Sequence, residues 1–231
     1  MQFDYTYITL FGFILFEPMV ILANLIFFLC ALYYYVSLKK FNNAYTRQMS
    51  LFMFLLGTSM AFGGAGHAIH YQLGVGFFNL ILFFMNAFSL LAMYYCFMGP
   101  YTYYKAGKEP APLTRYLILT WILLMLVYSM IVQNFALIKI HAGLGLIYAL
   151  TIHWIMYKRY QHRGSREVII GVFVAFLPII VHSLKISFDE WFNHKDIAHV
   201  LMIISLVIIC RGVKTNSEDI ESGKINIRSA A

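Results

Sequence analysis

Seven long apolar segments occupy most of this 231-residue chain and constrain its fold more than any other feature. A helix needs about 20 mainly apolar residues to cross the hydrocarbon core of a bilayer. Only 12% of the residues are charged, against roughly 25% in a soluble domain. The sequence therefore predicts an all-α bundle of seven transmembrane helices, over about residues 14–37, 49–70, 76–98, 114–133, 136–157, 167–186 and 196–213.

The two ends of the chain differ from these spans. Residues 3–13 are expected to extend the first helix or to lie at the membrane interface. Residues 1–213 form the predicted membrane domain, and residues 214–231 form a polar tail that we expect to be disordered. The span over Tyr116–Val132 has almost no strongly polar side chain, so we expect it to face lipid.

Basic residues indicate how the bundle is oriented. Fourteen of the 17 lysines and arginines fall in the loops after spans one, three and five and in the C-terminal tail. Because basic loops stay on the cytosolic side, the N-terminus is expected outside and the C-terminus in the cytosol. The net charge of +7 thus reflects topology and predicts no nucleic-acid partner. We expect a multi-pass protein of a bacterial inner membrane or, alternatively, of a eukaryotic endomembrane.

Ionisable side chains gather at the outer end of the predicted bundle. Such groups are costly in or beside a bilayer, so a one-sided cluster is a hypothesis for a functional site. Its members are six histidines and four acids: His67, His70, His141, His182, His194, His199, Glu17, Asp189, Glu190 and Asp196.

The second and seventh spans carry the best candidates for chemistry. His67 and His70 are three residues apart and share a helix face, although His70 is equally well explained as an interfacial side chain. Asp196 and His199 are also three apart. Asp196 is expected either in the site or as a helix cap. His199, a full turn into the span, is the better functional candidate.

Other polar residues have structural explanations of equal or greater weight. Glu17 precedes Pro18 and is either a helix-start residue or a carboxylate that faces the bundle. Asn24, Asn79 and Asn86 are expected mainly to form hydrogen bonds between helices. His141 and His182 are either partners that orient a ligand or core histidines bonded to carbonyl groups.

The seven spans, the histidine late in span two and the histidine pair at the start of span seven resemble the alkaline ceramidase / progestin-and-adipoQ-receptor superfamily. Members of that superfamily are seven-helix, zinc-dependent membrane hydrolases. The resemblance implies His67, His194 and His199 as zinc ligands, Glu17 or Asp196 as the group that takes a proton, and His70, Asn79, His141 and His182 as surrounding polar partners.

The sequence departs from the pattern of that superfamily at three points. The family's pair in span seven is usually four residues apart, whereas His194 and His199 are five apart. Gly63 stands where the family has a serine before the histidine of span two. Span three has no aspartate and offers only asparagines.

The resulting expectation is a zinc-dependent hydrolase that acts on a lipid-like amide or ester near the outer membrane face. The alternative is a non-enzymatic receptor or scaffold whose polar cluster is structural or senses a ligand. A haem protein and a proton-coupled transporter rank below these two. Membrane lipid is the expected partner in every case.

Overall fold

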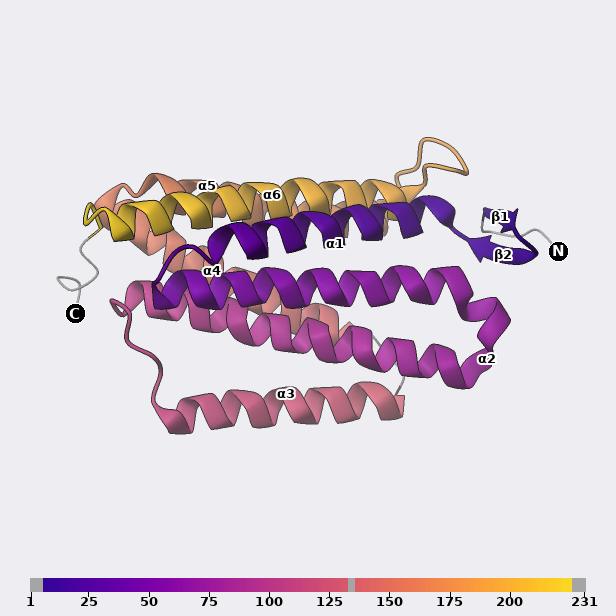
Figure 1. The fold of residues 1–231 in the computed structure, drawn as a ribbon, viewed down its shortest axis with the longest axis horizontal. Coiled ribbons are helices and arrows are strands. Elements are labelled where there is room, and N and C mark those ends of the chain that lie inside the picture. The colour runs from indigo at the N-terminus through magenta and orange to yellow at the C-terminus, as the bar shows by residue number, and fades with distance from the viewer. Residues whose placement is uncertain (1–5, 133–135, 226–231) are drawn as a thin grey trace.

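The computed structural model describes residues 6–132 and 136–225, apart from the side chains of residues 69–71, 73 and 136. Within these ranges the chain forms a short β-hairpin followed by six helices (Figure 1). The hairpin pairs β1 (Tyr7–Leu10) with β2 (Phe13–Phe16) in antiparallel register. The helices are α1 (Pro18–Leu38), α2 (Ala44–Tyr104), α3 (Pro112–Val132), α4 (Ala136–Tyr160), α5 (Arg163–Leu184) and α6 (His194–Glu221).

The six helices provide seven segments long and apolar enough to cross a membrane. Helix α2 supplies two of them, Ala44–Ala68 and Gly74–Tyr104. The chain reverses between these segments at Gly74, whose φ of +70° is incompatible with a helix and favours glycine. The predicted all-α, seven-span membrane bundle is therefore confirmed, while its orientation in the membrane stays a prediction.

The helices run along the long axis of the molecule, and β1 and the last turn of α6 lie at opposite ends (Figure 1). Helix α1 packs against α2 and α6, α5 packs against α6, and α4 packs against α2 and α5. Helix α3 lies at the edge of the bundle and contacts α2 and α4. It buries only Ile122, Met125 and Ser129, as expected for a span that faces lipid.

Polar side chains tie the helices together at the end away from the hairpin. Tyr103 of α2 donates its hydroxyl hydrogen to Asn216 Oδ1 of α6 over 3.2 Å and also lies 2.7 Å from His162 Nδ1. Its ring stacks on that of Tyr45, with centroids 4.7 Å apart. Because Tyr45, Tyr103 and Asn216 are all fully buried, this end of the bundle is closely packed.

The C-terminal tail was predicted to be disordered from residue 214, and this is wrong for its first part. Helix α6 continues to Glu221. Asn216 and Ser217 are fully buried, and Ser217 Oγ lies 2.5 Å from Thr46 Oγ1 of α2. These polar residues continue the helix because they form hydrogen bonds with side chains of α2. The polarity of the sequence alone does not predict such partners.

The N-terminal segment does not extend the first helix, which was one of the two structures expected for it. Residues 7–16 form the hairpin and do not extend the first helix, which begins at Pro18. Glu17 has a φ of +50° and so interrupts any helix before it. The fixed φ of proline suits the first helical position, where a backbone N–H is not needed.

Helices α5 and α6 pack backbone against backbone at Gly164 and Gly212. A Cβ atom added to Gly212 would lie 2.6 Å from the carbonyl oxygen of Gly164 and 2.8 Å from the backbone nitrogen of Val168. Both neighbours are backbone atoms, which cannot move aside without shifting a helix.

We expect Gly212→Ala to lower the free energy of unfolding by about 1–3 kcal/mol, because the added methyl group forces α5 and α6 apart. The measurement is thermal or denaturant unfolding in detergent micelles. Gly143→Ala is the matched control, since nothing lies within 4 Å of its added Cβ. Equal stability of the two variants would contradict the close contact.

Candidate functional site

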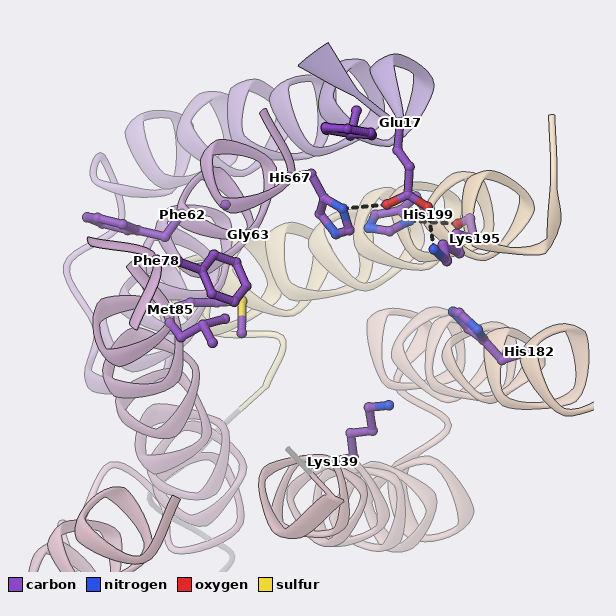
Figure 2. Close-up of a pocket in the computed structure, with 13 residues that line it drawn as sticks. Glu17, Phe62, Gly63, His67, Phe78, Met85, Lys139, His182, Lys195 and His199 are labelled. Carbon is purple, nitrogen blue, oxygen red and sulfur yellow. Dashed lines mark hydrogen bonds and ion pairs between the residues drawn. The ribbon is translucent and has the colours of Figure 1, made fainter. Parts of the chain in front are cut away.

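A pocket of about 570 Å³ opens at the hairpin end of the bundle. It lies where α1 begins, where α2 reverses, and where α5 ends and α6 begins (Figure 2). Its lining combines aromatic and aliphatic residues with ionisable ones: Phe16, Glu17, Phe62, Gly63, Gly66, His67, Phe78, Leu82, Met85, Lys139, His182, Lys195 and His199.

Glu17 occupies the junction between the hairpin and α1. Its side chain is only 4% exposed, although it is the residue directly before the first membrane helix. Its backbone N–H donates to the carbonyl oxygen of Thr6 over 2.8 Å, which anchors the junction to the base of the hairpin. The local geometry therefore turns the carboxylate away from solvent and into the bundle.

Two side chains from distant segments compensate the buried charge of Glu17. His67 of α2 places Nδ1 2.5 Å from Glu17 Oε2, and Lys195 of α6 donates to Oε1 (Figure 2). Burial alone would raise the pKa of Glu17, but the hydrogen bonds and charges of His67 and Lys195 outweigh it and hold the pKa at about 2. Glu17 is therefore a carboxylate at every physiological pH.

His199 is held in one tautomer beside this ion pair. Its Nδ1 lies 2.7 Å from the carbonyl oxygen of Lys195, one turn earlier on α6, and must donate because a carbonyl only accepts. Nε2 is then the acceptor, and Asn24 Nδ2 of α1 donates to it over 3.2 Å. The same amide donates to the carbonyl oxygen of Val20 over 2.9 Å. Asn24 thus forms the interhelical hydrogen bond predicted for it.

Nitrogen-bearing side chains also approach from the other wall of the pocket. Lys139 of α4 and His182 of α5 point toward it from the side opposite Glu17 (Figure 2). With His67, Lys195 and His199, five of the described lining side chains carry basic nitrogens, and Glu17 is the single acid in this described lining. A negatively charged group would be stabilised between these walls.

The remaining wall is apolar. Phe62, Phe78 and Met85 line it on the side of α2 (Figure 2), and Leu82 completes it. Gly63 and Gly66 also line the pocket, where the absence of a side chain leaves space. The pocket therefore joins an apolar wall to a polar, nitrogen-rich one, a combination typical of small-molecule sites.

Four of the residues expected in the site from the sequence meet at this pocket: Glu17, His67, His182 and His199. His194, expected as a zinc ligand, is not in its lining. The His194 ring lies instead edge-on to that of His182, with centroids 5.3 Å apart. Its position at the first residue of α6 directs it beside the pocket.

Asp196 has the helix-start role that was one of its two expected roles. Asn193 is the N-cap of α6, and Asp196 Oδ2 accepts the Asn193 N–H over 2.9 Å in a reciprocal capping box. Asp196 is 2% exposed and does not line the pocket. Its Oδ1 has no hydrogen-bond partner among the described residues, so its role as a proton acceptor stays a prediction.

Of the other three expected residues, His141 and Asn79 do not line the pocket. His141 is buried in α4 with its ring 5.8 Å from that of Phe97. Asn79 is half-buried in the second segment of α2. The side chain of His70 lies outside the described residues. Contact of His141 or Asn79 with a metal-bound group therefore stays a prediction.

Lys195 and Lys139 line the pocket but were not predicted as site residues from the sequence. They are two of the three basic residues that the sequence places on the outer side. A signal for Lys195 was present, because it precedes His199 by four residues and must share its helix face. No local signal exists for Lys139. It reaches the pocket only because α4 packs against α2 and α5.

The donor set of a zinc site is only partly present. Histidines that bind a metal donate their other ring N–H to a carboxylate or carbonyl group, and the Nδ1 atoms of His67 and His199 have such partners. A catalytic zinc needs three protein ligands. Among the described residues, no group of three His, Cys, Asp or Glu side chains could hold a metal. The arrangement described thus falls short of a complete zinc site.

Comparison with known proteins gives a family but no activity. Residues 19–218 match the sequence profile described as "Family of unknown function (DUF6962)". The match overlaps all seven spans and contains His67, Lys195 and His199, and it begins two residues after Glu17. No curated protein and no solved structure matches the chain.

We expect the stabilising effect of Glu17 to weaken at acid pH. A pKa lowered from 4.5 to about 2 in the folded protein gives stability that is complete above pH 4.5 and is lost as the pH falls toward 2. The free energy of unfolding of the wild type relative to Glu17→Gln should drop by about 1.4 kcal/mol between pH 6 and about pH 3.5.

Denaturant unfolding in micelles at both pH values measures this effect. Glu109→Gln is the control, because Glu109 pairs with Arg47 and Arg115 at an exposed position, where ion pairs contribute about 0–1 kcal/mol. A difference between wild type and Glu17→Gln that does not change with pH would contradict the ion-pair assignment.

Proposed function

Since the chain belongs to this family of unknown function (DUF6962), we propose its function from the pocket: it binds an amphipathic, lipid-like molecule with an acidic head group. The observation that carries the proposal is the pairing of an apolar wall with a wall of basic nitrogens in one pocket at the end of a membrane bundle. This is the ligand-sensing alternative raised by the sequence, now with a defined chemistry.

The charge balance of the lining favours an anion. The carboxylate of Glu17 is already compensated by Lys195 and His67. Lys139 adds a positive charge on the facing wall, so the lining is positive overall even with every histidine neutral. A carboxylate or phosphate head accepts charge-assisted hydrogen bonds from such groups, whereas a cationic head would be repelled.

The size and apolar wall of the pocket suit one acyl chain. A volume of about 570 Å³ falls within the roughly 300–1,000 Å³ of ordinary ligand pockets. Phe62, Phe78, Leu82 and Met85 offer carbon surface and no strong hydrogen-bonding group. Because the pocket lies at one end of the spans, a ligand can reach it from the adjoining leaflet, which the basic loops predict to be the outer one.

We expect oleate to bind the purified protein in nanodiscs more tightly than oleyl alcohol, because only oleate carries a charge for Lys139 to stabilise. Lys139→Met should weaken oleate binding by about tenfold, or about 1.4 kcal/mol, and leave oleyl alcohol unaffected. Displacement of a fluorescent fatty acid measures both.

Two further variants sharpen the test. Lys39→Met removes a lysine at the far end of the bundle, between α1 and α2, and should change nothing. Gly66→Leu should weaken both ligands, because its side chain would enter the apolar wall near Phe78 and Ile81. Equal binding of oleate and oleyl alcohol to the wild type would reject an acidic head group.

The zinc hydrolase implied by the resemblance is a second candidate. It is supported by the carboxylate and carbonyl partners of the Nδ1 atoms of His67 and His199. In His199, a metal at Nε2 would have to replace the hydrogen bond from Asn24. It still requires a third ligand: His182 lines the same pocket, and the His194 ring lies 5.3 Å from that of His182. In this candidate the same pocket would hold a lipid-like amide or ester.

Metal content separates the two candidates. If the hydrolase proposal is correct, protein purified without chelators should hold about one zinc per chain by mass spectrometry, and His67→Ala and His199→Ala should both lose it. His153→Ala is the control, because His153 is fully buried in α4 beside Tyr103, away from the pocket. Zinc-free wild type after incubation with zinc salts would reject this candidate.

A further inference from the structure

The hairpin before α1 consists of apolar and uncharged side chains throughout. Residues 6–16 include no charged residue, and their polar side chains are limited to two threonines and a tyrosine. Most of the apolar side chains are exposed: Tyr7 49%, Ile8 37%, Leu10 49%, Phe11 93% and Phe13 58%. Exposed apolar surface of this density indicates a partner that covers it.

One side of the hairpin rests on the bundle. Gln72 of α2 donates its side-chain amide hydrogen to the carbonyl oxygen of Ile14, and Ile14, Leu15 and Phe16 are at least half-buried. Phe16 also lines the pocket. A two-stranded hairpin is marginal in water by itself, so the exposed side chains of β1 and of the turn need an apolar environment.

The tip of the hairpin presents an aromatic ring at a strained position. Phe11 and Gly12 form the turn with φ values of +51° and +82°. Glycine and asparagine adopt such values readily, whereas a bulky residue does so at a cost of about 1–3 kcal/mol. The most exposed large side chain of the hairpin therefore stands where the backbone disfavours it, which indicates a use for the ring outside the fold.

The hairpin starts at the surface of the membrane. Glu17 alone separates β2 from Pro18, the first residue of the apolar helix α1. Four-residue strands reach about 13 Å from that point, and the head-group layer on each side of a bilayer is about 5–8 Å thick. A hairpin that leans along the surface therefore stays within this layer.

A second loop at the same end has the same character. The connection from α5 to α6 exposes Phe188 by 78% and Trp191 by 50%. In Figure 1 this loop and the hairpin extend from the same end of the bundle. Aromatic side chains gather at this level of membrane proteins because their rings suit the interface between lipid and water.

We propose that the hairpin of β1 and β2 is a membrane-inserting element, whose tip at Phe11 enters the lipid interface of the leaflet beside the pocket. The partner is the lipid surface itself. Because Phe16 belongs to both the hairpin and the pocket lining, insertion keeps that side of the pocket next to lipid. The proposal depends on the membrane bundle and not on the ligand or the chemistry of the pocket.

The test places a nitroxide label on Phe11→Cys in phosphatidylcholine nanodiscs that hold one copy of the protein. The background is Cys30→Ala, because the other two cysteines, Cys96 and Cys210, are buried. Collisions with oxygen, which concentrates in lipid, are compared with collisions with a water-soluble nickel chelate. Labels at Lys108, on an exposed loop, and at Leu124, on the lipid-facing α3, give the water and lipid standards.

The expected ratio of oxygen to nickel collisions at Phe11 is several-fold above that at Lys108 and approaches that at Leu124. A ratio equal to that at Lys108 would overturn the proposal. So would dipolar broadening in discs loaded with two copies together with low access to both reagents, because a second chain would then cover the hairpin. Phe13→Cys, 58% exposed beside the tip, repeats the measurement if Phe11→Cys does not fold.

Discussion

The buried carboxylate of Glu17 is the charge around which the hairpin end of the molecule is organised. A carboxylate that is 4% exposed would be strongly destabilising without compensation. Lys195 and His67 supply that compensation from α6 and α2, so one acid at the head of α1 joins three membrane helices. Its backbone also holds the hairpin, through the hydrogen bond to Thr6. The hairpin, the pocket and the rotation of α6 therefore depend on the same residue.

Polar residues have different roles at the two ends of the bundle. At the end away from the hairpin, Tyr103 and Asn216 bond to each other in a closely packed region, and the glycines of α5 and α6 bring these helices into contact. At the hairpin end the polar residues border open space. Buried polar groups that satisfy one another stabilise a bundle, whereas ionisable groups that line a pocket are candidates for contact with a ligand.

The chemistry of the pocket separates the two functional candidates. Lys195 and Lys139 bring positive charge to the same lining as His67 and His199, which favours an anionic ligand and opposes the binding of a cation such as zinc. A zinc ion would have to compete with this charge and draw a third ligand, such as His182, to His67 and His199. Binding of an acidic lipid needs no such rearrangement, and for this reason it is the primary proposal.

Much of the architecture was determined by the sequence alone, because hydropathy and segment length are local properties. They predicted seven spans, the lipid-facing position of α3 and the polar end that contains Glu17, His67, His182 and His199. They did not predict the hairpin, the extension of α6 to Glu221, or the pocket lysines. Lys195 pairs with an acid 178 residues away, and Asn216 accepts a hydrogen bond from Tyr103 of α2. Only tertiary structure decides such contacts, because they depend on how each helix is rotated against its neighbours.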